Sequence, residues 1–378
     1  MIELPAFGGL LQEHGFTFFS GVPCSFLRGL ISYALNHLDY CAAANEGDAV
    51  AIAAGAALGG RRAAVLLQNS GLTNALSPLT SLNHVFRIPV LGFVSLRGEP
   101  GLADEPQHEL LGEITAELLR VCRIETLLLD RDLEEVRRQL AQVDQLLRQD
   151  RSVFVIVRKG TFAEEPLVQR LRVPDCARRL HLSQGRPTLP RRIEALAAVS
   201  GLRDRNTVLL ATTGKTGREL YEIEDHPGNL YMVGSMGCVS SLGLGLALAR
   251  PEKKVIAIDG DGALLMRMGS LATNGFYRPP NLLHIVLDNR CHDSTGGQDT
   301  VSENVRFAAV ASYSGYPAAL EVHDLGEFTT AVQTWLQAGG LTLLSLPIAR
   351  GSREALGRPG IKPVEVKERL MRYVQRNR

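Results

Sequence analysis

The feature that most constrains the fold is a repeated alternation between short apolar runs and longer segments with helical periodicity. This alternation is typical of α/β proteins, in which parallel strands are buried on both faces of a sheet. The runs that fit buried strands lie at residues 17–21, 62–68, 89–96, 152–157, 207–212, 229–234, 254–259, 281–288 and 341–346. The sequence therefore predicts an α/β protein built on doubly wound parallel sheets.

The distribution of these runs divides the chain into two halves. A chain of 378 residues is long for one hydrophobic core, so we expect two domains of ordinary size. Residues 161–191 are rich in Arg, Pro and polar side chains and lack clear periodicity, which predicts a linker. The expected domains are residues 1–160 and 192–378, and the charged stretch from Pro363 to Arg378 predicts a surface helix.

Charge and cysteine content narrow the functional classes. The chain has 41 Lys and Arg against 40 Asp and Glu, so nucleic acid is not an expected partner. The six cysteines are scattered without a zinc-binding spacing, which predicts reduced thiols and a cytoplasmic protein. Because the N-terminus has no signal-like segment and no apolar run reaches about 18 residues, we expect neither secretion nor membrane spanning.

The strongest chemical signal is the triplet Gly260-Asp261-Gly262 at the end of a predicted strand. A helix-like stretch, another strand and the pair Asp288-Asn289 follow it. In a parallel sheet this order places Asp261 and Asn289 after neighbouring strands, at the edge where α/β sheets bind ligands. Oxygen-bearing side chains suit Mg²⁺, and Gly262 lets the backbone approach a diphosphate at a helix N-terminus. The alternative is a plain turn with a strand-end cap.

The glycine-rich stretch from Gly243 to Leu248 offers a competing prediction. It imitates part of a dinucleotide-binding fingerprint, and acidic residues follow it. Its first glycine lies well beyond the preceding strand, however, whereas the fingerprint begins at the strand-to-helix turn. Small residues on a closely packed helix explain the stretch better, so a nicotinamide enzyme is the weaker prediction.

The motif from Gly260 to Asn289 resembles that of the thiamine-diphosphate-dependent enzymes, which opens with GDG and closes with Asn-Asn or a variant. The resemblance implies that Asp261 and Asn289 bind Mg²⁺ together with the carbonyl of Cys291. Because the first residue of the closing pair is Asp288 here, Asp288 is an alternative to Asn289. The implied fold is a pyrimidine-binding domain followed by a diphosphate-binding domain, with no middle domain.

The same resemblance implies how the rest of the cofactor is held. Met236 falls where family members place a bulky wedge between the cofactor rings, although a buried Met is more often core packing. The carbonyl of Gly234 would then face the aminopyrimidine. The other residues assigned to cofactor binding lie in or near these motifs, and they are Asn74, Thr212, Thr213, Gly260, Gly262 and Ala263.

Glu46 begins an Ala-rich helical stretch for which Asn45 is a plausible N-cap. A Glu at such a position needs no role beyond a favourable interaction with the helix dipole. In the resembled family, a Glu at the head of this kind of helix binds the pyrimidine ring and promotes its imino tautomer. The resemblance therefore implies that Glu46 is catalytic and faces the diphosphate site of another subunit, in a homodimer or higher homo-oligomer with shared active sites.

Further stretches are similar to the phosphonopyruvate decarboxylases, with sulfopyruvate decarboxylases as the next relatives. They are Gly21 to Ser25, Gln68 to Asn74, Arg97 to His108 and His292 to Gln298. The implied reaction converts 3-phosphonopyruvate, a small anionic 2-oxo acid, to phosphonoacetaldehyde and CO₂ with thiamine diphosphate and Mg²⁺. Sulfopyruvate decarboxylation, carboligase or acetyltransferase chemistry, and a non-catalytic cofactor-binding subunit are the alternatives.

Several polar side chains at strand ends and helix starts are candidates for holding the anionic substrate. They are Ser25, Arg97, Lys215 and Arg218. An isolated Lys or Arg is more often a solvated surface charge. His108 and His292 flank glycine-rich loops and are candidates for proton transfer, although a lone His is more often structural.

Overall fold

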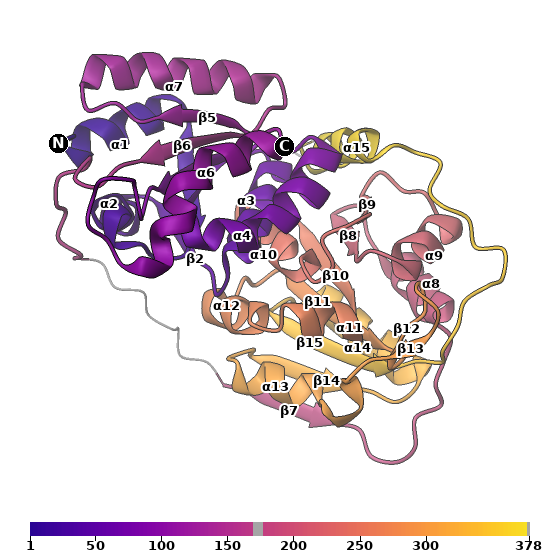
Figure 1. The fold of residues 1–378 in the computed structure, drawn as a ribbon. Helices are drawn as coiled ribbons and strands as arrows, with labels where there is room; N and C mark the ends of the chain where they lie inside the picture. The colour runs from indigo at the N-terminus through magenta and orange to yellow at the C-terminus, as the bar shows by residue number, and fades with distance from the viewer. Residues whose placement is uncertain (169–176, 376–378) are drawn as a thin grey trace. The chain divides into compact units, whose positions relative to one another are not determined.

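The computed structural model describes residues 1–168 and 177–375 and divides the chain into two compact units, Met1–Arg172 and Val173–Arg378. Each unit contains a parallel β-sheet flanked by helices (Figure 1). The predicted α/β architecture is thereby confirmed. Within the described ranges, no helix combines the length and apolar character needed to cross a membrane.

The first unit contains a six-stranded parallel sheet in the order β2-β1-β3-β4-β6-β5. Its strands are β1 (Phe16–Gly21), β2 (Asp39–Ala42), β3 (Arg62–Gln68), β4 (Leu91–Ser95), β5 (Glu125–Leu128) and β6 (Val153–Val157). Its helices are α1 (Leu4–Glu13), α2 (Arg28–His37), α3 (Glu46–Leu58), α4 (Asn69–Pro78), α5 (His84–Phe86), α6 (Glu109–Val121) and α7 (Leu133–Arg148), with short helical segments η1 (Ser25–Leu27), η2 (Leu79–Asn83) and η3 (Pro106–His108). The central strands β4 and β6 are buried along their whole length because helices cover both faces of the sheet.

The second unit contains a seven-stranded parallel sheet in the order β7-β14-β15-β11-β10-β8-β9, and a small antiparallel ribbon of β12 and β13. Its strands are β7 (Arg179–Leu182), β8 (Thr207–Ala211), β9 (Asn229–Tyr231), β10 (Lys254–Gly260), β11 (Leu282–Asp288), β12 (Cys291–His292), β13 (Gln298–Asp299), β14 (Ala318–Glu321) and β15 (Thr342–Pro347). Its helices are α8 (Arg192–Leu202), α9 (Lys215–Ile223), α10 (Val239–Ala249), α11 (Asp261–Met266), α12 (Ser270–Tyr277), α13 (Phe307–Tyr313), α14 (Leu325–Ala338) and α15 (Pro363–Gln375), with the short segment η4 (Ser302–Asn304).

Strand β7 lies inside the segment expected to be a linker, residues 161–191. It pairs in parallel with β14 at the edge of the second sheet, and most of its side chains are exposed. Residues 169–176 of the expected linker lie outside the described residues. The expected C-terminal helix is α15, which packs on β9, and residues 376–378 of that expectation are likewise outside the description.

The order of strands in the second sheet positions the functional loops. β10 pairs with β11 on one side and with β8 on the other, in parallel register. The loops after these three strands therefore open at the same edge of the sheet. This confirms the prediction that Asp261 and Asn289 follow neighbouring strands.

Candidate active site

A cleft of about 60 Å³ opens at the carboxyl ends of β8, β10 and β11. It brings together most of the residues assigned from the sequence to the cofactor and the metal. These are Thr212, Thr213, Met236, Gly260, Asp261, Gly262, Ala263, Asn289 and Cys291, and the lining also includes Lys215 and His292. Met236 is only half-buried and lines this cleft, so it is not enclosed in the core. Gly234, between β9 and α10, does not line it.

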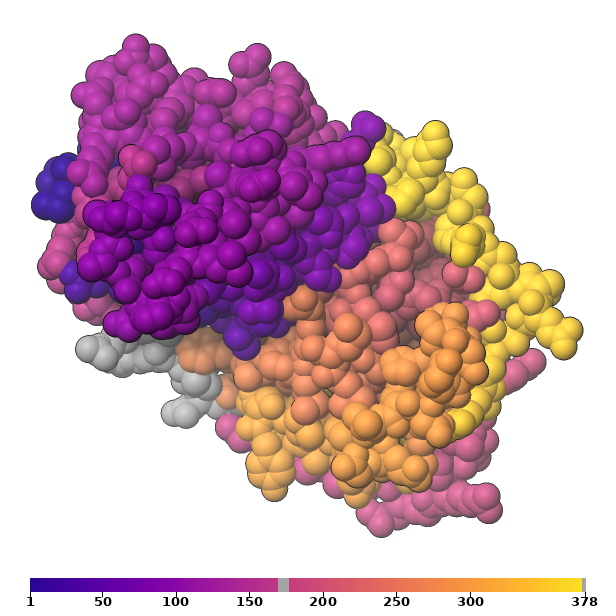
Figure 2. All heavy atoms as spheres, viewed as in Figure 1, coloured from indigo at the N-terminus to yellow at the C-terminus, as the bar shows by residue number. Residues whose placement is uncertain are grey.

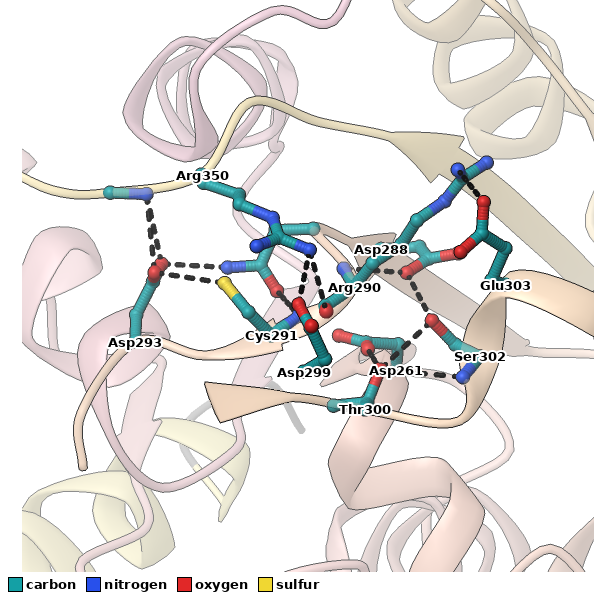
Figure 3. A network of polar contacts seen from close by, with 12 residues as sticks. Asp261, Asp288, Arg290, Cys291, Asp293, Asp299, Thr300, Ser302, Glu303 and Arg350 are labelled. Carbon is teal, nitrogen blue, oxygen red and sulfur yellow. Dashed lines mark hydrogen bonds and ion pairs between the residues drawn. The ribbon is translucent and has the colours of Figure 1, made fainter. Parts of the chain in front are cut away.

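Asp261 begins α11 directly after β10 and is almost fully buried. The Thr300 hydroxyl donates to Oδ2 of Asp261 and lies 3.0 Å from the Ser302 hydroxyl. Ser302 in turn donates to Oδ1 of Asp288 at 2.9 Å. Figure 3 shows this chain of contacts, which ties the two carboxylates to the loop after β13.

Asn289 is oriented by a carboxylate that is not predicted from the sequence. Its amide nitrogen donates to Oδ2 of Asp293 at 2.6 Å, which fixes the side of the amide that carries the oxygen. Asp293 also accepts from the Cys291 thiol at 3.1 Å and from the Gly351 amide at 3.2 Å (Figure 3). A buried ion pair with Arg192 of α8 completes the cluster. The sequence signal for Asp293 is its place in the stretch from His292 to Gln298.

Burial and neighbouring groups shift the proton affinities around this cleft. Burial, together with the charge of Asp261, raises the pKa of the Asp288 carboxyl. Burial and the hydrogen bond to Asp293 raise the pKa of the Cys291 thiol to about 12. For Asp293 itself, burial is outweighed by hydrogen bonds from Arg192 and Cys291, which lower the pKa. The cleft thus holds a neutral thiol beside an ionised carboxylate.

The cleft fits a diphosphate with a hard cation. Thr212 Oγ1 is buried and lacks a hydrogen-bond partner among the described residues, so a donor is free in the wall of the cleft. A Cβ at Gly262 would lie 2.6 Å from Cε1 of His292, so any larger residue there would displace the His292 ring. Asp261 and Asn289 offer oxygen ligands, and Mg²⁺ completes its shell with phosphate and water. In the described part of the chain, no group of three His, Cys, Asp or Glu side chains is suited to hold a metal alone.

Glu46 lies in the first unit at the start of α3, where Asn45 caps the helix by accepting from the Gly47 amide at 2.8 Å. Asn74 of α4 donates to Oε2 of Glu46 at 2.9 Å. A Cβ on Gly71, also in α4, would lie 2.1 Å from Oε1. The carboxylate therefore rests directly on α4, and the Asn74 amide assigned to the cofactor is used by Glu46.

Arg97 and Ser25, both assigned to the substrate, are neighbours in the first unit. Nη1 of Arg97 donates to the Ser25 hydroxyl at 3.0 Å, and the rest of the guanidinium forms a largely buried ion pair with Asp104. Hydrogen bonds from Arg97 hold the pKa of Asp104 well below its usual range. The charge of Arg97 is therefore already compensated within the unit.

The remaining predicted residues differ in their surroundings. His108 is the last residue of η3, directly before α6, and it is buried. Its Nδ1 has no hydrogen-bond partner among the described residues. His292 and Lys215 line the cleft of the second unit. Arg218, one turn into α9, does not line it and faces a separate cavity instead.

Comparison with known proteins identifies the family. The models "Thiamine pyrophosphate enzyme, N-terminal TPP binding domain" and "Thiamine pyrophosphate enzyme, C-terminal TPP binding domain" match residues 6–117 and 213–346. The chain is 41% identical over 367 residues to a phosphonopyruvate decarboxylase from Streptomyces viridochromogenes. The aligned region covers 95% of this chain and 92% of that protein. The chain belongs to the phosphonopyruvate decarboxylase family of thiamine pyrophosphate enzymes.

Two further comparisons place this family member more broadly. A sulfopyruvate decarboxylase from Methanosarcina acetivorans is 31% identical over 306 residues, covering 77% of this chain and 76% of that protein. The crystal structure of benzoylformate decarboxylase from Polynucleobacter necessarius superposes with a TM-score of 0.72 at 13% identity, covering 93% of this chain and 100% of that chain. The family, the fold and the cofactor inferred from the motifs are thereby confirmed.

Proposed function

We propose that the chain catalyses the non-oxidative decarboxylation of 3-phosphonopyruvate to phosphonoacetaldehyde and CO₂, with thiamine diphosphate and Mg²⁺. The observation that carries the proposal is the match to a phosphonopyruvate decarboxylase over nearly the whole of both chains. The relatives described above are all named decarboxylases, which favours this chemistry over a carboligase or acetyltransferase reaction.

The second unit is proposed to hold the diphosphate end of the cofactor. We assign Asp261, Asn289 and the carbonyl of Cys291 to Mg²⁺. Asn289 is preferred to Asp288 because Asn289 lines the cleft and Asp288 does not. Both side chains accept a hydrogen bond from the backbone, and Asp288 accepts a further one from Ser302. When bound, the cofactor supplies the nucleophilic carbon and the electron sink that decarboxylation needs. The other proposed contacts of the cofactor are Thr212, Thr213, Gly234, Met236, Gly260, Gly262 and Ala263.

The first unit is proposed to supply proton control. Glu46 would hold a proton against the pyrimidine ring, with its carboxylate kept in place by α4. His108 is proposed as a proton donor to the product because its Nδ1 is buried and unpartnered among the described residues, and His292 because it lines the cleft. A homodimer or higher homo-oligomer that shares these sites, in the cytoplasm, completes the proposal.

A panel of 2-oxo acids tests the substrate. The full chain, loaded with thiamine diphosphate and Mg²⁺, is given phosphonopyruvate, sulfopyruvate or pyruvate, and the released CO₂ and aldehyde are measured. We expect the highest kcat/KM for phosphonopyruvate. Sulfopyruvate is the second candidate, supported by the relative with 31% identity. A higher kcat/KM for sulfopyruvate would change the assigned substrate but not the proposed cofactor chemistry. Cofactor binding without release of CO₂ from any acid would indicate a non-catalytic subunit.

A further inference from the structure

A second cavity, of about 350 Å³, lies beside the cofactor cleft in the second unit. The two share Thr213 and Gly214, the loop that follows β8. The rest of its wall comes from the first turn of α9 and from the end of β9 with the residues that follow it. It also comes from the segment 348–362, which connects β15 to α15, and from the first turn of α15. A ligand in this cavity would therefore lie one loop away from the proposed diphosphate site.

The connecting segment is fastened along its course. At one end, the Gly351 amide donates to Asp293, and at the other α15 packs on β9. Between these points Arg353 forms an ion pair with Glu222 of α9, with the two atoms 3.2 Å apart. The yellow stretch before α15 runs along α9 in Figure 1 and covers part of the surface of the second unit in Figure 2. The wall of the cavity is thus a positioned element of the fold.

Two guanidinium groups line this cavity, Arg218 from α9 and Arg358 from the connecting segment. In the part of the chain that the structure describes, neither has a carboxylate or another hydrogen-bond partner. Met232 and Val233 make part of the wall apolar. Arg218 is half-buried and Arg358 is exposed. Two uncompensated cations that line the same cavity together favour an anion there.

We propose that this cavity takes the phosphonate end of the substrate, with Arg218 and Arg358 as its charge partners. The inference rests on the proposed function and deepens it, because it names a contact, Arg358, that the motifs do not reveal. A phosphonate presents several oxygens to planar guanidinium forks, which bind such groups through paired hydrogen bonds. Pyruvate has only a methyl group at that end, so the two arginines set the selectivity.

Single substitutions of the arginines test the subsite in the loaded enzyme. We expect Arg358→Gln and Arg218→Gln each to lower the ratio of kcat/KM for phosphonopyruvate to that for pyruvate by about tenfold or more. Arg372→Gln is the control, because Arg372 is exposed on α15 and lines neither the cavity nor the cofactor cleft. Its ratio should not change.

A binding measurement without turnover accompanies the kinetics. Methylphosphonate, which cannot be decarboxylated, is titrated into each holoenzyme and followed by phosphorus NMR, and its Kd should rise about tenfold in the two cavity variants only. Unchanged ratios and unchanged methylphosphonate binding in both variants would overturn the subsite and leave the proposed function standing. Weaker cofactor binding with an unchanged ratio of kcat/KM values would also overturn the subsite, since the arginines would then bind the diphosphate of the cofactor and not the substrate. Arginine-dependent methylphosphonate binding by a chain that cannot decarboxylate phosphonopyruvate would support the cavity and overturn the proposed function.

Discussion

At the scale of single residues, the position of the Glu46 carboxylate depends on two residues of α4, one that donates a hydrogen bond and one that has no side chain. Asn74 gives the carboxylate a hydrogen bond, and Gly71 gives it room. Both residues lie one helical turn apart on the same face of α4, so they contact the same carboxylate. A small change in α4 should therefore move Glu46 without altering its chemistry.

We predict that Gly71→Ala displaces the Glu46 carboxylate and lowers kcat by at least about tenfold, because positioned acid–base catalysis contributes about 10²–10⁴-fold. Hydrogen–deuterium exchange at the reactive carbon of the bound cofactor should slow in parallel, while the Kd of the cofactor changes little. Gly9→Ala in α1 is the control, since a Cβ there meets nothing within 4 Å. Equal exchange rates in Gly71→Ala and the wild type would contradict the role given to Gly71.

Asp293 gives the second prediction at this scale. Asp293→Asn keeps the size of the side chain but weakens its hold on the Asn289 amide, and groups that orient metal ligands typically change affinity by about 10–100-fold. A Mg²⁺ titration of cofactor binding, after chelation of the ion, should show a rise in the apparent Kd of that order. Asp299→Asn, which removes an exposed partner of Arg350 nearby, is the control. A Mg²⁺ affinity equal to that of the wild type would show that Asp293 is only structural.

The sequence predicts these residues unequally. Asp261, Asn289 and Met236 stand in motifs whose order along the chain already places them at one sheet edge. Gly71 lies in the stretch Gln68 to Asn74, but nothing in that stretch predicts its contact with Glu46, and Arg358 lies in no motif. The roles of both depend on side chains that lie close only after folding. Local pattern can therefore locate the cofactor cleft, whereas the positioning contacts around it require the three-dimensional structure.

At the scale of elements, an ion pair between Arg97 and Asp104 joins the two ends of one loop in the first unit. The hydrogen bonds from Arg97 lower the pKa of Asp104 below its unfolded value near 3.9, so the carboxylate form stabilises the folded state. This contribution is complete above pH of about 4 and is lost as pH falls through the lowered pKa. Asp104→Asn should cost about 1.5–3 kcal/mol at pH 7.

Denaturant unfolding at neutral and acid pH checks this prediction. The difference between Asp104→Asn and the wild type should shrink progressively as the pH falls below about 4, and it should vanish only below the lowered pKa, where the folded wild type also lacks the carboxylate. Glu13→Gln serves as the control, because its exposed pair with Arg137 is worth about 0–1 kcal/mol. A difference that is the same at all pH values would mean that the ion pair does not stabilise the loop.

The elements also show where sequence patterns fail. Long apolar strands such as β3, β10 and β11 are predicted because a strand buried on both faces must be apolar throughout. β2, β5, β7 and β14 are missed, since each has only four residues and includes half-buried or exposed positions. β7 and β5 also lie at sheet edges, where polar side chains are tolerated.

At the scale of the whole molecule, the proposed site draws on both units. Glu46 belongs to the first, and Asp261 to the second. If the site is shared between subunits, Glu46→Gln and Asp261→Ala chains, each inactive alone, should regain activity when assembled together. A mixed dimer then has one site without either lesion. Purification with two different tags, followed by a CO₂ assay, measures the recovery, and verified hetero-oligomers with no activity would favour sites built within one chain.

The hydrogen bonds between Gly351 and Asp293 join the segment that carries Arg358 to the carboxylate that orients Asn289. If Mg²⁺ binding and phosphonate binding both stabilise this contact, each changes the affinity for the other by the same factor. Mg²⁺ should tighten methylphosphonate binding, and methylphosphonate should tighten Mg²⁺ binding by the same factor. Calorimetric titrations in both orders measure the two factors, and Asp293→Ala, which removes the acceptor of the Gly351 amide, should bring both towards one. The enzyme would then bind its anionic substrate tightly only when Mg²⁺ is already bound at the cofactor site.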